Sequence, residues 1–245
     1  MPDSNSAHVL ITGASSGLGW GFARQLLGEG AHVYALNRRA PRDLLNEFSE
    51  RLRFETCDLE NFDAIAPALE RLLTGVERLD LVILNAGILG EFADMRDSQM
   101  EDLRRMMDVN LWSNKVLLDA LFARGGQVSE VLAISSGASV NGHRGWNAYS
   151  ISKAALNMLV KLYAAEVPET HFVSLAPGLI DTDMQEFIAR QPDAVVQKFG
   201  ALERLRQARG TPDMPGPEAA AEKILAARET LGALPSGSFA DIRKL

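Results

Sequence analysis

A tyrosine and a lysine four residues apart could form a proton-transfer site in this chain. Tyr149 and Lys153 begin an apolar-periodic segment typical of a helix, so their side chains would share one helix face. A phenol has a pKa of about 10, and a nearby ammonium favours its phenolate. One ammonium about 4 Å away could supply the roughly 4 kcal/mol that lowers this pKa by about 3 units. Tyr149 is therefore a candidate general acid or base near neutral pH.

A serine that precedes the tyrosine by thirteen residues could join this site. The apolar run 131–134 predicts a buried strand, and Ser136 follows its carboxyl end. From there the Ser136 hydroxyl could donate a hydrogen bond to a carbonyl oxygen with which Tyr149 exchanges a proton. A Tyr-x-x-x-Lys pair also occurs by chance on exposed helix faces. The hypothesis therefore depends on the elements around it.

The composition favours one α/β domain. The chain has 245 residues, 47% of them hydrophobic, which suffices for a single core over residues 1–245. A net charge of −7 argues against a general nucleic-acid or acidic-membrane surface, since both need a basic face. The single cysteine suits a reducing compartment, and the sequence has no apolar stretch of the roughly 18 residues that a membrane span needs. We therefore expect a cytoplasmic protein with no nucleic-acid partner, no membrane partner and no metal site.

A glycine-rich turn joins the first predicted strand, residues 9–12, to the first predicted helix. Such a turn lets the backbone approach a pyrophosphate, and the helix N-terminus favours the negative charge. The spacing of Gly13 and Gly17 differs from G-x-G-x-x-G, so this interpretation depends on the flanking strand and helix. The candidate cofactor-binding residues of the turn are Gly13, Ser15, Ser16, Gly17, Leu18 and Gly19.

The end of the second predicted strand, residues 32–36, would face the adenosine ribose of a dinucleotide. An acidic residue there would bind a free 2′-hydroxyl, but the sequence has Asn37, Arg38 and Arg39. Two guanidinium groups suit a 2′-phosphate through charge-assisted hydrogen bonds. We therefore predict NADP(H) as the cofactor, with Asn37 and Arg38 among the residues that bind it.

Strands and helices continue to alternate along the chain. Residues 52–57, 81–84 and 172–176 predict further strands, and 61–73 and 98–122 predict helices. This order predicts a doubly wound parallel sheet of the Rossmann type with about seven strands. Ligands bind at the carboxyl ends of such strands. Five further cofactor-binding candidates follow two of these strands: Asp58, Leu59, Asn85, Ala86 and Gly87.

Taken together, these motifs resemble the short-chain dehydrogenase/reductase family over the whole chain. The shared set, in order, is Thr12-Gly13-x-x-x-Gly17-x-Gly19, Asn85-Ala86-Gly87, Asn110, Ser136, Tyr149-x-x-x-Lys153 and Pro177-Gly178. The resemblance implies that Tyr149 is the general acid and that Lys153 lowers its pKa and holds the nicotinamide ribose. It also implies that Ser136 orients the carbonyl and that Asn110 anchors a proton-relay water. Leu84 departs from the family's more usual asparagine.

The last third of the chain should determine substrate choice. In the family, the turn after residues 172–176 lies along the nicotinamide, which implies cofactor contacts from Pro177, Gly178, Ile180 and Thr182. Two short helical patterns between residues 185 and 209 interrupt the alternation. We expect them to form a small substrate lid over about 182–215, because long insertions beside a cofactor often gate a site. A seventh strand is expected at 237–242.

Within the family, Gly145-Trp146, the turn that begins at Pro177, and the tail around Asp241 resemble the sepiapterin reductase and benzil reductase group. In sepiapterin reductases the matching aspartate holds the pterin's amino groups, which makes Asp241 a candidate substrate anchor. An aspartate at the end of a strand can also simply cap a turn. The candidate substrate-binding residues are Ser136, Gly137, Trp146, Gly178 and Asp241.

Three functions remain open: an NADPH-dependent carbonyl reductase acting on a small molecule, a non-catalytic NADP-binding redox sensor, and a cofactor-retaining epimerase or dehydratase. The complete set of Asn110, Ser136, Tyr149 and Lys153 favours the reductase. The family also implies a homo-oligomer, dimer or tetramer, in which helices 98–122 and 149–166 meet their copies. The apolar residues expected at that interface are Met106, Leu111, Leu117, Leu118, Leu156, Leu159, Val160 and Tyr163.

Overall fold

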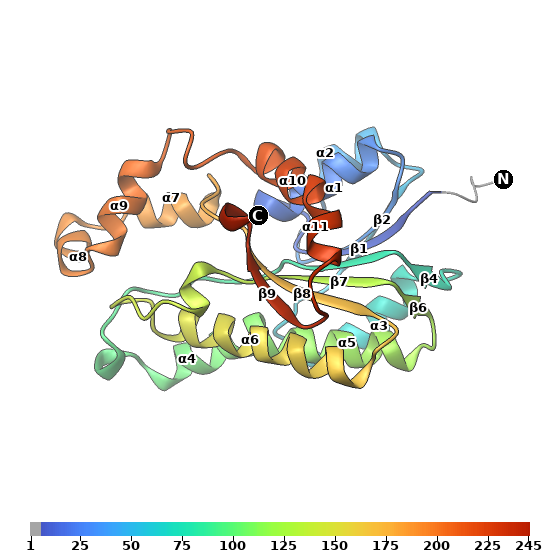
Figure 1. Ribbon diagram of the computed structural model, residues 1–245, viewed down its shortest axis with the longest axis horizontal. Coiled ribbons are helices and arrows are strands. Elements are labelled where there is room, and N and C mark those ends of the chain that lie inside the picture. The colour runs from blue at the N-terminus through green and yellow to red at the C-terminus, as the bar shows by residue number, and fades with distance from the viewer. Residues whose placement is uncertain (1–5) are drawn as a thin grey trace.

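A seven-stranded parallel sheet forms the centre of the molecule (Figure 1). The computed structural model describes residues 6–245. In spatial order the strands are β3 (Leu52–Thr56), β2 (His32–Asn37), β1 (His8–Thr12), β5 (Leu81–Leu84), β7 (Glu130–Ile134), β8 (His171–Ala176) and β9 (Ser238–Asp241). Every neighbouring pair is parallel. The predicted doubly wound sheet is confirmed.

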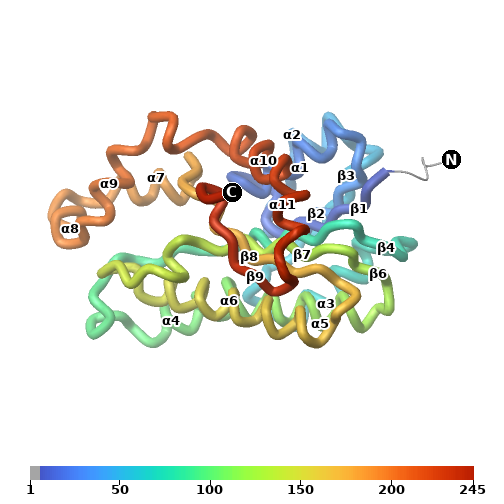
Figure 2. The backbone as a smooth tube through the Cα atoms, viewed as in Figure 1, coloured from blue at the N-terminus to red at the C-terminus, as the bar shows by residue number. Residues whose placement is uncertain are grey.

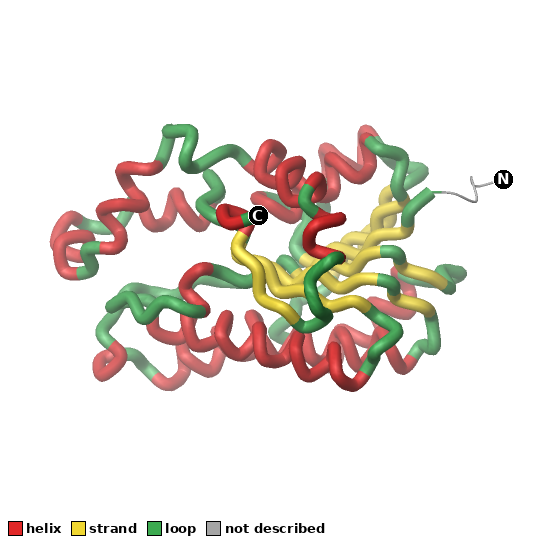
Figure 3. The backbone as a smooth tube through the Cα atoms, in the orientation of Figure 1, coloured by secondary structure: helices red, strands yellow, loops and turns green. Residues whose placement is uncertain are grey.

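Helices cover both faces of the sheet, so the strands are buried on both sides (Figure 3). One face packs against α1 (Gly17–Gly28), α2 (Arg42–Glu47), α10 (Pro217–Ala226) and α11 (Arg228–Gly232). The other packs against α3 (Phe62–Leu72), α5 (Ser113–Ala123) and α6 (Asn147–Glu166). Successive residues of a strand point to opposite faces. Accordingly Val9 and Ile11 of β1 join the first core, and Leu10 joins the second.

A second, two-stranded sheet was not predicted from the sequence. It pairs β4 (Arg78–Leu79) with β6 (Gln127–Val128) in parallel. Strands of two residues are too short to show a hydrophobic period, so no pattern marks them. None of the helices described between residues 6 and 245 is long and apolar enough to span a bilayer.

The long helix predicted over 98–122 is interrupted in the structure. It consists of α4 (Met100–Met107), a π-helical segment (Asp108–Trp112) and α5. The π-helical segment contains Asn110, whose side chain is fully buried. Short π-helical segments inside α-helices often mark functional sites. The predicted helical stretch is therefore present, and the π-helical segment at the candidate Asn110 is a feature that the sequence did not indicate.

Three helices, rather than the expected two patterns, form the region after β8. They are α7 (Asp183–Ala189), α8 (Asp193–Lys198) and α9 (Ala201–Ala208), and they project beyond the sheet as the orange tube of Figure 2. This helical segment has its own small core, which includes Ile188, Phe199 and Leu202. Phe199 also contacts the body of the protein, because a Cβ added at Gly145 would lie 2.7 Å from its ring.

The apolar residues predicted for a subunit interface lie elsewhere. Met106, Leu111, Leu117, Leu118, Leu156, Val160 and Tyr163 are buried inside the subunit, and Leu159 is partly buried against the same core. A helical period shows that a face is apolar but does not say whether the face meets the sheet or another chain. The large apolar side chains that α6 exposes are Ile151, Met158 and Leu162, and Trp112 is exposed in the π-helical segment.

Close packing of α1 against α10 leads to a stability prediction. A Cβ added at Gly21 would lie 2.4 Å from the Pro217 carbonyl oxygen, whereas Gly28 at the end of the same helix has no atom within 4 Å. Overpacking costs about 1–3 kcal/mol, which exceeds the roughly 0.5–1 kcal/mol that alanine gains over glycine in a helix. We expect Gly21→Ala to lower the free energy of unfolding in chemical denaturation and Gly28→Ala to leave it unchanged or raise it. Equal effects of the two substitutions would contradict this packing account.

Candidate active site

A cavity of about 420 Å³ lies over the carboxyl ends of the strands. Residues that follow β1, β2, β3, β5, β7 and β8 all contribute to its wall. The predicted site residues in the wall are Gly13, Ser15, Ser16, Gly17, Leu18, Asn37, Arg38, Asp58, Leu59, Asn85, Ala86, Gly87, Ser136, Gly137, Trp146, Tyr149, Lys153, Pro177, Gly178, Ile180 and Thr182. Three predicted residues lie behind the wall instead: Gly19, Asn110 and Asp241.

The end of β7 and the start of α6 bring Ser136, Tyr149 and Lys153 together. The Lys153 ammonium donates a hydrogen bond to the Ile134 carbonyl oxygen at 2.7 Å, which ties the helix to the last residue of the strand. Ser136 begins a 3₁₀ turn (Gly137–Ser139), and its hydroxyl oxygen accepts a hydrogen bond from the Ala138 N–H at 3.1 Å. A hydroxyl that accepts in this way can still donate its own proton. Ser136 therefore has a donor available for a ligand in the cavity.

Burial determines the acid-base behaviour of both α6 side chains. It raises the pKa of Tyr149, and the interaction with the Ser136 hydroxyl opposes this rise. It lowers the pKa of Lys153 to about 8, because a charged ammonium loses hydration in the interior. The sequence suggested that Lys153 would lower the pKa of Tyr149. In the structure the ammonium lies over the tyrosine ring, 5.9 Å from its centroid, and donates to a backbone carbonyl, so burial has the larger effect.

The Asn110 side chain connects three segments through hydrogen bonds. Its Oδ1 accepts from the Ile88 N–H at 2.8 Å, and its Nδ2 donates to the Ile88 carbonyl at 3.0 Å and to the Ser152 hydroxyl at 3.1 Å. Its backbone carbonyl accepts from the side chain of Asn114 at 3.0 Å, which satisfies a group that the π-helical segment releases from the regular helix pattern. The side chain thus joins the segment after β5 to α6. Its role as the anchor of a relay water stays a prediction.

The glycine-rich turn lies against the end of β5. Asn85 donates from Nδ2 to the carbonyls of Thr12 and Gly13 at 3.1 and 3.2 Å, so this side chain holds the turn. A Cβ added at Gly19 would lie 2.2 Å from the Gly13 carbonyl oxygen, which explains a glycine outside the cavity wall. Gly13 and Gly17 have φ values of +75° and +57°, a region that favours glycine. The turn leaves its backbone open to the cavity, as a pyrophosphate requires.

The ribose end of the cavity contains donors without protein partners. Asn37 accepts from the Ala14 N–H at 2.5 Å, whereas its buried Nδ2 has no partner in the described part of the chain. Arg38 and Arg39 are exposed and form no ion pair with any of residues 6–245. Glu60 forms an ion pair with Arg105 at 2.7 Å. The hydrogen bond from Arg105 lowers the pKa of the Glu60 carboxyl, and the charge of Arg38 adds a smaller effect in the same direction. Free guanidinium groups and an unpaired amide beside a glycine-rich turn fit a phosphorylated dinucleotide.

Comparison with known proteins agrees with this geometry. A family model described as short chain dehydrogenase matches residues 7–193. The chain belongs to this family. It is 31% identical over 233 residues to a benzil reductase ((S)-benzoin forming) of Bacillus subtilis, covering 90% of this chain and 92% of the relative. It is 30% identical over 237 residues to a 3-oxoacyl-acyl-carrier-protein reductase of Rickettsia bellii, covering 94% and 93%.

A solved structure supports the same placement. The crystal structure of the KRED1-Pglu enzyme matches with a TM-score of 0.83 and 29% identity, covering 96% of this chain and all of that chain. Members of the short-chain dehydrogenase family are oxidoreductases that bind a nicotinamide cofactor. One cavity of this chain is lined both by the glycine-rich turn and by Ser136, Tyr149 and Lys153.

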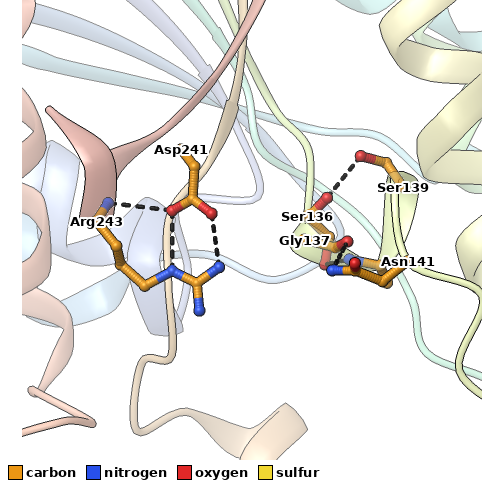
Figure 4. Close-up of polar contacts among 7 residues, drawn as sticks. Ser136, Gly137, Ser139, Asn141, Asp241 and Arg243 are labelled. Atoms are coloured by element: carbon orange, nitrogen blue, oxygen red, sulfur yellow. Dashed lines mark hydrogen bonds and ion pairs between the residues drawn. The ribbon is translucent and has the colours of Figure 1, made fainter.

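The C-terminal tail differs from the expectation. Asp241 does not line the cavity, because its carboxylate accepts hydrogen bonds from Arg243, two residues on (Figure 4). Arg243 is the tail residue in the wall. Sequence reasoning missed Arg243, although a cation two residues after a strand-end aspartate was a usable signal. It also missed Asn141, His143 and Arg204, which line the same cavity and belong to no motif that we identified.

The buried lysine leads to a pH prediction. Its pKa is about 8 in the folded protein and 10.5 when the side chain is fully solvated, so between these values the unfolded chain binds more protons. Stability from this group therefore rises with pH across that window, and below about pH 8 the buried charge costs its full amount. We expect Lys153→Met, without cofactor, to gain stability relative to wild type at pH 7 and to lose part of that gain by pH 10.5. Denaturant unfolding at several pH values measures it, with the exposed Lys161→Met as control. A difference that does not change with pH would contradict the account.

Proposed function

We propose that this chain catalyses the NADPH-dependent reduction of a small-molecule carbonyl compound to the alcohol, the substrate being a ketone, a diketone or a pterin side-chain carbonyl. The observation that carries the proposal is the convergence of Ser136, Tyr149 and Lys153 at one end of the cavity that holds the glycine-rich turn. A proton donor, a carbonyl-orienting hydroxyl and a cation at one point suit the conversion of a carbonyl to an alcohol.

The mechanism assigns one task to each side chain. A nicotinamide cofactor bound in this cavity would supply the hydride for the carbonyl carbon. The Ser136 hydroxyl donates to the carbonyl oxygen and stabilises the negative charge that develops there. Tyr149 gives its proton to the same oxygen; burial raises its pKa, so the phenol carries this proton at neutral pH. Lys153 binds the ribose and stabilises the phenolate that this proton transfer leaves.

Different residues around the cavity bind different parts of the cofactor. Arg38, Arg39 and the free Nδ2 of Asn37 hold the 2′-phosphate. The glycine-rich turn holds the pyrophosphate, and Asp58 and Leu59 flank the adenine. Ile180 and Thr182 lie along the nicotinamide side. A Cβ added at Gly17 would lie 3.3 Å from the Thr182 methyl group, so the turn and the loop after β8 enclose the same space.

Apolar side chains form part of the substrate end of the cavity. Its wall includes Trp146, Leu179, Met184, Ile188 and Leu205, and the last three come from the helical segment 183–208. Such a wall suits an apolar ketone or diketone. The names of the benzil reductase and oxoacyl reductase relatives agree with carbonyl reduction. We propose that residues 182–215 act as a lid over the substrate, within a single domain.

We further propose that the protein acts in the cytoplasm as a homo-oligomer, a dimer or tetramer that assembles through α5 and α6. Ile151, Met158 and Leu162 are exposed apolar side chains on α6, and Trp112 is exposed in the π-helical segment that precedes α5. A two-fold axis would bury these side chains against their copies. The same helices carry Tyr149 and Lys153, so assembly would hold these groups rigidly from behind. Light scattering that gives a mass of 26.7 kDa for active enzyme would exclude the oligomer.

Removal of one hydroxyl tests the function. We expect Tyr149→Phe to abolish NADPH oxidation with ketones, diketones and sepiapterin while NADPH binding persists, because the ring remains and the exchangeable proton is lost. Steady-state absorbance measures turnover, and fluorescence titration measures binding. Tyr163→Phe is the matched control, since its hydroxyl lies on the same helix outside the cavity and bonds Asp119. A Tyr149→Phe enzyme that keeps a tenth of the wild-type rate would reject Tyr149 as the acid.

Removal of one guanidinium tests the cofactor preference. We expect Arg38→Leu to weaken NADPH binding by roughly tenfold or more, and NADH binding much less, because only NADPH has a 2′-phosphate to lose its charge-assisted hydrogen bonds. Arg42→Leu is the control, an exposed arginine on α2 that does not line the cavity. Dissociation constants for both cofactors provide the measurement. Equal losses for NADPH and NADH would show that Arg38 does not contact the phosphate.

A further inference from the structure

The last strand ends in an aspartate and an arginine that form a fixed pair. Arg243 donates from Nε to Asp241 Oδ1 at 2.9 Å and from Nη2 to Oδ2 at 2.6 Å. The Arg243 backbone N–H donates to the same Oδ1 at 3.0 Å, so the carboxylate is held by the turn as well as by the side chain. The Asp241 side chain is 10% exposed and the Arg243 side chain is 56% exposed. Asp241 therefore fixes the guanidinium from behind, and the outer edge of the guanidinium remains accessible.

Counting donors shows what the outer edge can bind. A guanidinium has five N–H donors. Asp241 takes the Nε donor and one Nη2 donor, so three remain, two on Nη1 and one on Nη2. Within residues 6–245 these three donors have no hydrogen-bond partner. They lie in one plane and point away from the carboxylate, which is the arrangement that receives an oxygen acceptor.

Two glycines that line the cavity lie next to the Arg243 side chain, and one of them directly follows Ser136. A Cβ added at Gly137 would lie 3.4 Å from Arg243 Nη2, and one added at Gly178 would lie 3.7 Å from Arg243 Cγ. Gly137 directly follows Ser136, whose hydroxyl faces the reacting oxygen in the proposed mechanism. Figure 4 shows the pair on the tail and the Ser136–Gly137 segment on the opposite side of the same space. The Arg243 guanidinium thus lies next to Gly137, the residue that follows Ser136 in the sequence.

We propose that Arg243, positioned by Asp241, is a specificity-determining residue that donates hydrogen bonds to a second, neutral carbonyl oxygen adjacent to the one being reduced, so that the enzyme favours 1,2-dicarbonyl substrates. This inference rests on the proposed reductase function. The net charge of the Asp241–Arg243 pair is the reason why we propose a neutral acceptor. Arg243 holds the pKa of the Asp241 carboxyl below its ordinary value, so Asp241 is ionised and cancels the charge of the guanidinium. A neutral pair offers donors to a carbonyl oxygen without attracting an anion strongly.

The experiment compares two substrates that differ by one carbonyl group. Acetophenone and 1-phenyl-1,2-propanedione share the phenyl ketone, and only the second has an adjacent oxygen. We expect Arg243→Leu and Arg243→Gln to lower the ratio of kcat/KM for the diketone to kcat/KM for the monoketone by roughly tenfold, as the loss of a hydrogen bond from a charged group predicts. The ratio removes any common loss of folded enzyme, and comparison of the variant ratio with the wild-type ratio removes the difference in intrinsic reactivity between the substrates.

Further variants separate contact from positioning. Asp241→Asn keeps the size of the side chain but weakens its hold on Arg243, and we expect it to lower the same ratio by a smaller factor. Asp241→Glu keeps a carboxylate, and we expect it to lower the ratio less than Asp241→Asn does. Lys244→Gln is the matched control, an exposed cation on the same 3₁₀ turn that does not line the cavity, and it should leave the ratio unchanged.

Three outcomes would overturn the inference. A ratio that Arg243→Leu and Arg243→Gln leave unchanged, in an enzyme that reduces both substrates, rejects the contact and leaves the reductase function intact. A larger loss with benzoylformate than with the diketone shows an anion site instead, to which Arg204 in the same wall would contribute. A wild-type enzyme that reduces neither ketone with NADPH contradicts the proposed function itself.

Discussion

The hydrogen bond from the buried Lys153 ammonium to the Ile134 carbonyl is the interaction on which the site depends. A charge in the interior is costly unless its protons find partners, and here one partner is the last carbonyl of a central strand. This contact fixes α6 to β7. It places Tyr149 one helical turn away and Ser136 two residues beyond the strand end. The cost of this burial is visible in the lysine pKa, which falls to about 8. A ligand that approaches the ammonium would recover part of that cost.

Asparagine side chains fix the neighbouring strand end in a similar way. Asn85 binds the carbonyls of Thr12 and Gly13, and Asn110 binds both backbone groups of Ile88. An amide suits this task because it has donors and an acceptor, which match the unpaired N–H and C=O groups where strands end. The loops over the sheet are therefore held by buried hydrogen bonds while their backbone faces the cavity. This explains how one face of the glycine-rich turn is rigid and the other is open to a phosphate.

Much of the fold and about half of the cavity wall could be predicted from residue patterns and from the family resemblance. Buried strands such as Leu81–Leu84 are continuous apolar runs, and the glycines at 13, 17 and 19 occur where only a missing side chain fits. The features that the sequence did not indicate have a common cause. The π-helical segment, the outward face of α6 and the direction of the Tyr149 pKa all depend on burial against residues distant in sequence. Local periodicity does not contain that information, and Arg243 was missed because the tail motif marks only its partner Asp241.

The two ends of the cavity use arginine in opposite ways, and the difference lies in one carboxylate. At the proposed ribose end Arg38 forms no ion pair within the described residues, and the neighbouring Glu60 pairs with Arg105. At the substrate end Asp241 binds Arg243 through two donors and neutralises it. An unpaired guanidinium suits a phosphate, whereas a neutralised one keeps directional donors with little attraction for anions. In the proposed arrangement, Arg38 would therefore face the phosphate of the cofactor, and the Asp241–Arg243 pair would face a neutral acceptor. The protein has a net charge of −7, so acidic side chains are plentiful. The difference between the two arginines therefore depends on where those acidic side chains lie.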